Sequence, residues 1–182
     1  ADGHGGESSA ALEKKNSASA PAGRPAFRKG AFFLGVAGGT GSAEGVIGGI
    51  VGMLNAEYAI TNEIGLGLST GYWRYSEALD ISGTGSSSIT FQYSVVPIVA
   101  TGAYHFNVGN PKLDLAAGAL FGYYIVNATI DAGSSFSISG KGNAVAYGVF
   151  GLARYFLSDS LALRAKVGYG VTLAEAGIDL RF

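Results

Sequence analysis

Eight charged side chains stand within otherwise apolar stretches, and they are the residues most able to do chemistry. Four are carboxylates and four are cations: Glu57, Asp114, Glu175 and Asp179, with Arg154, Arg164, Lys166 and Arg181. An isolated buried charge is strongly destabilising, so such groups must be paired or solvated. The balanced set therefore predicts an interior ion-pair network. A narrow gated ion path is the alternative hypothesis, and a catalytic pair of carboxylates is the third.

Other chemistries have weaker support. The sequence has two histidines, and we expect His105 to be an interfacial side chain beside a turn. Ser-rich stretches at 86–88 and 134–139 have no neighbouring base, and a serine without a base is a weak nucleophile. The Gly-rich stretch 35–41 lacks the Lys-Ser/Thr ending of a phosphate loop. There is no Cys, hence no thiolate chemistry. We therefore predict a protein that is not an enzyme and has no cofactor or metal.

The charges alternate with apolar residues at the period of a β-strand. The last segment shows this best, because Glu175, Asp179 and Arg181 lie between apolar neighbours. Those neighbours are Ala174, Ala176, Ile178, Leu180 and Phe182. A period of two places the charges on one face and the hydrocarbon on the other. In a membrane barrel the charged face looks into the lumen and the apolar face looks at lipid.

Eight strand-like segments follow one another, and the same pattern recurs in them except in the first and sixth, where Gly and Ala leave the two faces ambiguous. We place them at 30–39, 46–60, 64–78, 88–106, 113–128, 143–156, 160–170 and 172–182. Short turns at 61–63, 107–112 and 157–160 alternate with breaks at 40–45, 79–87 and 129–142. Short turns on one side and longer loops on the other are typical of outer-membrane barrels. An even number of strands would put both termini in the periplasm.

Composition limits the alternatives. Charged residues make up 14 % of the 182 residues, the formal net charge is −1 and the mean hydropathy is +0.29. The charge gives no reason to expect nucleic-acid binding. The longest apolar stretch, 115–126, is too short for a spanning helix, which needs about 20 residues. High apolar content without such a helix predicts a membrane β-barrel, and a soluble β-sandwich is the alternative.

Residues 1–29 differ from the rest of the chain, because Ser, Ala, Gly, Pro, Glu and Lys dominate. Such a composition buries too little apolar surface to fold alone. We expect a flexible periplasmic tail over 1–29 and a transmembrane barrel over 30–182. The tail is a candidate to bind an envelope protein or to fold into the barrel mouth. No signal-peptide pattern opens the sequence, so we expect the numbering to begin at a mature end, with a cytosolic protein as the alternative.

Three motifs make the pattern specific. Residues 56–68 and 153–163 each combine strand, short turn and strand, and residues 177–182 read Gly-Ile-Asp-Leu-Arg-Phe. With these motifs, residues 30–182 resemble the small eight-stranded bacterial outer-membrane proteins of the OmpA, OmpX and OmpW type. The resemblance implies an all-β, antiparallel, up-and-down barrel in the Gram-negative outer membrane. It also implies contact with outer-membrane lipid and lipopolysaccharide, and an assembly machinery that recognises Phe182, Leu180 and Ile178.

Aromatic residues cluster near the two ends of the strands, as in the girdles of membrane barrels. The girdle prediction comprises Tyr58, Tyr72, Trp73, Tyr75, Phe91, Tyr93, Tyr104, Tyr123 and Tyr155. The resulting hypothesis is a structural or interaction module whose lumen is plugged by charged side chains. The alternative is a small porin-like conduit for ions or small apolar molecules.

Overall fold

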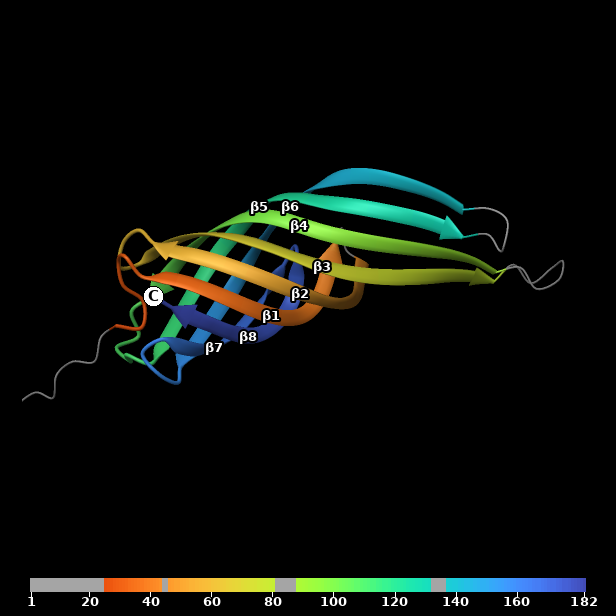
Figure 1. The fold of residues 1–182 in the computed structure, drawn as a ribbon. Coiled ribbons are helices and arrows are strands. Elements are labelled where there is room, and N and C mark those ends of the chain that lie inside the picture. The colour runs from red at the N-terminus through yellow and green to blue at the C-terminus, as the bar shows by residue number, and fades with distance from the viewer. Residues whose placement is uncertain (1–24, 44–45, 81–87, 132–136) are drawn as a thin grey trace, which may run out of the picture.

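The computed structural model describes residues 25–43, 46–80, 88–131 and 137–182, and these form a closed β-barrel (Figure 1). Eight antiparallel strands follow one another around the barrel in chain order. They are β1 (Phe32–Ala43), β2 (Val46–Ala59), β3 (Ile64–Asp80), β4 (Ser88–Phe106), β5 (Leu113–Asp131), β6 (Ser137–Phe156), β7 (Leu161–Tyr169) and β8 (Thr172–Arg181). The predicted eight-stranded, up-and-down fold is confirmed. No helix among the described residues is both long and apolar enough to cross a membrane.

The first and last strands close the barrel. Leu34 pairs with Leu180, and the ladder between β1 and β8 continues to Gly41 opposite Thr172. Each strand has a neighbour on both sides near the short turns, so this part of the sheet has no free edge. We call this end, with the connections 60–63, 107–112 and 157–160, the turn end.

Alternation along each strand separates the two faces of the wall. On β5, Asp114 is 2 % exposed and points inward, whereas Phe121 is 61 % exposed and points outward. On β7, Arg164 and Lys166 are buried and Val167 is exposed. These orientations agree with the sequence pattern, because successive side chains of a strand lie on opposite faces.

Four of the strands extend well beyond the other four. β3, β4, β5 and β6 have 17, 19, 19 and 20 residues, while β7 and β8 have 9 and 10. Figure 1 shows the hairpins β3–β4 and β5–β6 projecting from the barrel. We call this projecting part of the four strands the extension.

Because of the extension, two of the loops expected from the sequence are partly strand. Much of the loop expected at 129–142 is strand, because β5 runs to Asp131 and β6 begins at Ser137. β3 likewise continues to Asp80, within the loop expected at 79–87. Pairing with a neighbouring strand outweighs the weak strand propensity of Gly and Ser in these segments. The remaining parts of these breaks, 81–87 and 132–136, lie outside the described residues.

The barrel unit begins at residue 25, before the expected boundary at 30. Ala26 and Phe27 are 5 % and 7 % exposed and pack with Phe33 and Phe156 at the turn end. Gly30 adopts φ +84°, a conformation that favours glycine, and turns the chain into β1. Residues 25–29 are thus part of the barrel mouth. The rest of the tail expected over 1–29, residues 1–24, lies outside the described residues.

The interior has three layers. At the turn end lies a small apolar cluster of Ala26, Phe27, Ala31, Phe33, Ala59, Phe156 and Ala162. Above it lie the buried charges. Towards the extension lies a larger apolar cluster of Val51, Met53, Trp73, Val95, Val99, Ala103, Ala116, Leu120, Tyr124, Ala146, Phe150, Leu152 and Val171. We call these the lower apolar layer, the charge layer and the upper apolar layer.

Candidate functional site: the charge layer

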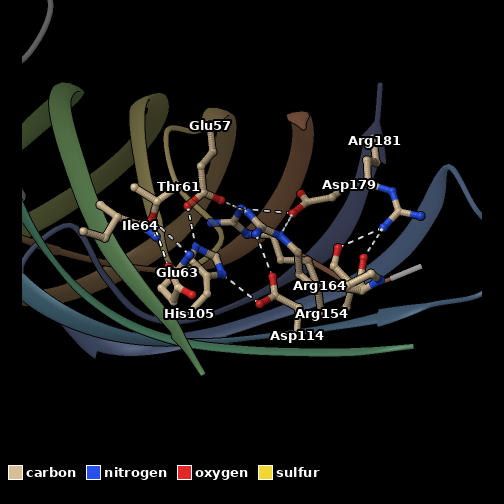
Figure 2. A network of polar contacts seen from close by, with 12 residues as sticks. Glu57, Thr61, Glu63, Ile64, His105, Asp114, Arg154, Arg164, Asp179 and Arg181 are labelled. Atoms are coloured by element: carbon tan, nitrogen blue, oxygen red, sulfur yellow. Dashed lines mark hydrogen bonds and ion pairs between the residues drawn. The ribbon is translucent and has the colours of Figure 1, made fainter. Parts of the chain in front are cut away.

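Arg154 of β6 is the centre of the charge layer (Figure 2). Its side chain is 1 % exposed, and its Nε donates to Asp179 while its Nη2 donates to Glu57. Its Nη1 lies 3.1 Å from Asp114 Oδ2. The guanidinium also stands over the ring of Phe33, 4.5 Å from its centroid. One cation from β6 therefore ties together carboxylates from β2, β5 and β8.

A second group of charges continues from Asp179. Arg164 Nη1 lies 3.4 Å from Asp179 Oδ2, and Arg164 Nη2 lies 3.0 Å from Glu175 Oε1. Lys166 Nζ is 3.0 Å from Glu175 Oε2, which also accepts a hydrogen bond from Thr172 at 3.1 Å. Seven of the eight charged residues singled out in the sequence thus form one connected network.

The eighth, Arg181, contacts the barrel mouth at the end of β8. Its guanidinium donates to the main-chain oxygens of Asp159 and Ala26 and stands 4.3 Å from the ring centroid of Phe156. Arg181 has the inward-facing parity that the sequence indicated. At the end of β8 its long side chain reaches the turn and the N-terminal segment.

His105 takes the place that was expected for Arg181. It is 2 % exposed, with Nδ1 2.7 Å from Asp114 Oδ1 and Nε2 3.0 Å from Glu57 Oε1. The expectation of an interfacial side chain was therefore wrong. Because both ring nitrogens face carboxylate oxygens, the geometry is that of an imidazolium, which donates twice. With His105 as an imidazolium, four carboxylates face four cations in this layer.

The sequence does contain a signal for this placement. His105 stands between Tyr104 and Phe106, which are 52 % and 49 % exposed on the outer face. A polar residue between two outward aromatics must point inward. The inward orientation of His105 was not predicted because the residue lies beside a turn, where a side chain could equally face solvent.

The remaining polar groups of the layer do not form an obvious reaction centre. Asn55 Oδ1 accepts from Ser69 at 2.8 Å, while Asn55 Nδ2 and Asp179 Oδ1 have no protein partner. A cavity of about 20 Å³ adjoins Asn55, which is room for about one water molecule. His105 contacts two carboxylates, so this imidazole is not placed to activate a hydroxyl. The arrangement holds strands together and offers no wide passage among the described residues.

The aromatic girdle is only partly where the sequence predicted it. Five members of the predicted set are about half-exposed on the outer face: Tyr58, Tyr72, Tyr104, Tyr123 and Tyr155. Trp73 is 2 % exposed and packs edge-on against Tyr124 in the upper apolar layer, so its assignment to the girdle was wrong. The rings of Tyr75 and Tyr93 stack on the inner side of the extension, with their centroids 4.8 Å apart. Phe91 lies on the same inner face. The error was one of parity, because neighbouring aromatics on a strand point to opposite sides.

The residues expected to guide assembly lie on the outer face of β8. Ile178, Leu180 and Phe182 are 44 %, 43 % and 69 % exposed. Phe182 N donates to Phe32 O at 2.8 Å, which extends the ladder that closes the barrel. These three side chains form a continuous apolar stripe beside β1.

Comparison with known proteins identifies the architecture. No family model matches the chain, and no curated protein matches its sequence. Among solved structures, Ail, the attachment invasion locus protein of Yersinia pestis, solved with the heparin analogue sucrose octasulfate, superposes with a TM-score of 0.57 at 17 % identity. That match covers 85 % of this chain and 99 % of Ail. This chain has the fold of the small outer-membrane β-barrels.

Two further structures agree with this fold. The N-terminal barrel of OprF from Pseudomonas aeruginosa gives a TM-score of 0.52 at 16 % identity, covering 85 % of this chain and 98 % of the other. Neisserial surface protein A gives 0.50 at 17 % identity, covering 84 % and 96 %. The resemblance inferred from the three sequence motifs is confirmed at the level of the fold.

Proposed function

We propose that this protein is a non-enzymatic outer-membrane barrel that acts as an interaction module through its extension. The observation that carries the proposal is the contrast between a closed interior and a large projecting wall. The outer face of the barrel supports a membrane location, because large apolar residues such as Leu54, Phe121 and Val167 are more than half exposed there. A band of this kind around a closed barrel matches hydrocarbon rather than water.

The three interior layers argue against the porin-like alternative. Ions would have to pass the lower apolar layer, the paired charges and the upper apolar layer in turn. An eight-stranded barrel is only wide enough for its own side chains, and here those side chains fill it. We expect planar bilayers with the wild-type protein to show no steady conductance. Clear conductance would favour the conduit instead.

The extension reverses the polarity of the wall. Below it the outer face is apolar, but in the extension the outer face carries polar residues: Arg74, Ser76, Gln92, Ser94, Asn127, Thr129, Ser139, Lys141 and Asn143. The inner face there carries apolar residues: Tyr75, Phe91, Tyr93, Val126, Ala128, Ile138 and Ala144. A polar outer face suits water, so we place the extension outside the membrane.

The edge of the extension offers a binding surface for an extended peptide. β6 pairs with β7 only from Val149 onwards, and Tyr147 and Gly148 lie against Tyr169 and Gly170. Among the described residues, 137–146 therefore have β5 on one side and no strand on the other. This edge contains one charged residue, Lys141, and no proline. Edge strands that avoid pairing with another chain usually contain more charged residues or a proline. An amphipathic strand added here would place its apolar side chains on the inner face.

Photo-crosslinking in intact cells tests this surface. A photoreactive residue replacing Asn143 should give a discrete protein adduct, whereas one replacing Asn62 at the turn end should not give the same adduct. Ala144→Lys places a charge on the inner face and should abolish the adduct, because an inward charge opposes strand addition. Ser139→Lys adds the same charge to the outer face and should leave the adduct unchanged. Adducts that survive Ala144→Lys would reject the edge as the binding surface.

The orientation follows from the same polarity. We place the turn end and residues 25–31 in the periplasm and the extension outside the cell. Residues 1–24 would then be available to an envelope protein, and β8 to the assembly machinery. Arg74 and Lys141 would lie just above the outer aromatics, where lipopolysaccharide carries phosphate. Protease cleavage of intact cells within 81–87 or 132–136, with 60–63 and 157–160 protected, tests this orientation; the opposite pattern would reverse it.

A further inference from the structure

Residues 25–31 cover the charge layer at the turn end. The ring of Phe27 lies parallel to the imidazole of His105, with centroids 3.4 Å apart and an interplanar angle of 5°. Phe27 also stacks with Phe33, with ring centroids 5.8 Å apart. Phe27 is 7 % exposed. The ring therefore covers one face of the His105 imidazole at the turn end.

This segment is fastened at a few points and is not a strand of the sheet. Gly30 N donates to Ala59 O at 2.8 Å, and Ala59 N donates to Ala31 O at 2.9 Å. Lys29 N donates to the side chain of Asn62 at 3.1 Å. Ala26 O accepts from Arg181 at 2.9 Å. A segment held by so few bonds opens at a lower free energy than a strand with two neighbours.

A cavity of about 440 Å³ lies directly beside the segment. Phe27 lines it, and so do apolar side chains at the β4–β5 connection: Phe106, Val108, Pro111 and Leu113. His105 and Asp114 of the charge layer also line it, together with Asn62 and Glu63. A phenyl ring that left His105 could enter this space and remain in contact with hydrocarbon.

We propose that residues 25–31 form a displaceable seal. In the closed position Phe27 stacks on His105. In the open position the ring occupies the adjoining cavity, and water reaches the face of His105 that the ring had covered. The strands stay paired in both positions, because the bonds of Gly30 and Ala31 with Ala59 continue the β1–β2 ladder and remain, and only the bonds of residues 25–29 are released. The upper apolar layer still closes the lumen, so opening hydrates the charges without forming a pore.

The seal gives the preceding residues a mechanical connection to the interior. Residues 1–24 lead directly into the segment that carries Phe27, so a partner that binds them would act on His105 through this ring. The inference deepens the proposed interaction role, but it rests on the closed barrel and the turn end alone. Its test therefore does not involve the extension, and the two proposals can fail separately.

Carbethoxylation of His105 by diethyl pyrocarbonate measures the opening. In the full-length protein folded in detergent, we expect His105 to react at least about tenfold more slowly than N-acetylhistidine added as a standard. Phe27→Ala should accelerate the reaction of His105 at least about tenfold while heat-modifiable gel migration shows an intact barrel. Phe32→Ala removes an aromatic ring from the outer face of β1 and should leave the rate unchanged. Mass spectrometry of the peptide that contains His105 gives each rate.

Two more variants separate the parts of the proposal. Phe27→Leu keeps an apolar side chain without a stacking ring and should give a rate of His105 carbethoxylation between those of wild type and Phe27→Ala. This variant also tests the seal if Phe27→Ala does not fold. Val108→Phe fills the cavity and should slow the reaction below the wild-type rate. Rapid wild-type labelling, or protection that survives both Phe27 substitutions, would overturn the seal. An unchanged rate in Val108→Phe would overturn the open position in the cavity.

Discussion

Arg154 shows why single side chains dominate the interior of a narrow barrel. Its guanidinium satisfies three carboxylates from three strands, and its flat face packs on Phe33. Sequence parity alone placed Arg154 and its partners on the inner face, because the strand period fixes which way a side chain points. Parity could not distinguish Arg181 from His105, since the reach of a side chain at a strand end depends on the turn it meets.

Removing Arg154 should be far more damaging than removing an exposed cation. Arg154→Met keeps the volume but leaves three carboxylates without their shared partner, at a cost of about 3–5 kcal/mol in unfolding free energy. Trp73 is the only tryptophan and is buried, so its fluorescence reports urea unfolding in micelles. Arg74→Met changes an exposed arginine and should stay within about 0.5 kcal/mol of wild type. Equal urea midpoints for the two variants would show that the charge layer contributes little.

The contact of His105 with Asp114 should appear as a coupling between the two residues. His105→Asn removes the cation that faces this carboxylate, and Asp114→Asn removes the carboxylate. Because each single change strands the other partner, the double variant should be more stable than the sum predicts, by about 0.5–3 kcal/mol. Combining His105→Asn with Arg74→Asn provides the control, and these two distant changes should be additive. Additive behaviour of His105 and Asp114 would contradict an ion pair between them.

At the scale of the strand, glycine decides how closely charges and backbones approach. Gly35 of β1 faces inward, and a Cβ there would collide with Asp179 Oδ1 and lie 3.2 Å from the carbonyl oxygen of Ile178. Gly52 of β2 faces outward, and a Cβ there would meet nothing within 4 Å. The sequence alone left β1 ambiguous, because a run of Gly and Ala has no polarity to alternate.

This contrast predicts opposite outcomes for the same substitution. Gly35→Ala should lower the unfolding free energy by about 1–3 kcal/mol, since the added methyl forces Asp179 away from its partners. Gly52→Ala should be neutral or slightly stabilising, because alanine restricts the unfolded chain more than glycine does. Urea midpoints in the same micelles measure both. A Gly35→Ala protein as stable as Gly52→Ala would mean that Asp179 has room to move.

The segments misjudged from sequence share a physical cause. Residues 137–142 were expected to be loop because they are rich in Gly and Ser. Residues 25–29 were expected to be tail because they end the stretch 1–29, in which Ser, Ala, Gly, Pro, Glu and Lys dominate. In the structure β5 provides a ladder for the first segment, and the barrel mouth buries Phe27 of the second. Local composition reports what a segment can do alone, and these two segments are ordered by what they contact.

At the scale of the molecule, the fold was the most predictable feature. Eight alternating segments and short turns on one side determine an up-and-down barrel almost without reference to individual residues. The layering of the interior was not predictable, because it depends on register: which inward residues of different strands reach the same height. Register brought Glu57, His105, Asp114 and Arg154 together from four strands.

The layering predicts that weakening one layer does not open the barrel. Arg164→Ala should lower the urea midpoint, because it leaves Glu175 without one of its two cations. It should not produce steady conductance in planar bilayers, because the upper apolar layer remains closed. The same measurement on Phe150→Ala, which thins the upper layer and keeps the charges, is the matched control. Conductance in Arg164→Ala alone would make the charge layer the only barrier.

The unequal strands also determine how the molecule deforms a bilayer. On β5 the outward apolar side chains run from Leu113 to Ile125, and on β7 they run from Leu161 to Tyr169. At the usual rise and tilt of barrel strands, these stretches span roughly 30 Å and roughly 20 Å along the membrane normal. Lipids beside β7 must therefore shorten or tilt relative to lipids beside β5, at a modest free-energy cost for each ångström of mismatch. The barrel would carry a gradient of hydrophobic thickness around its circumference, with the thinnest membrane along the short strands.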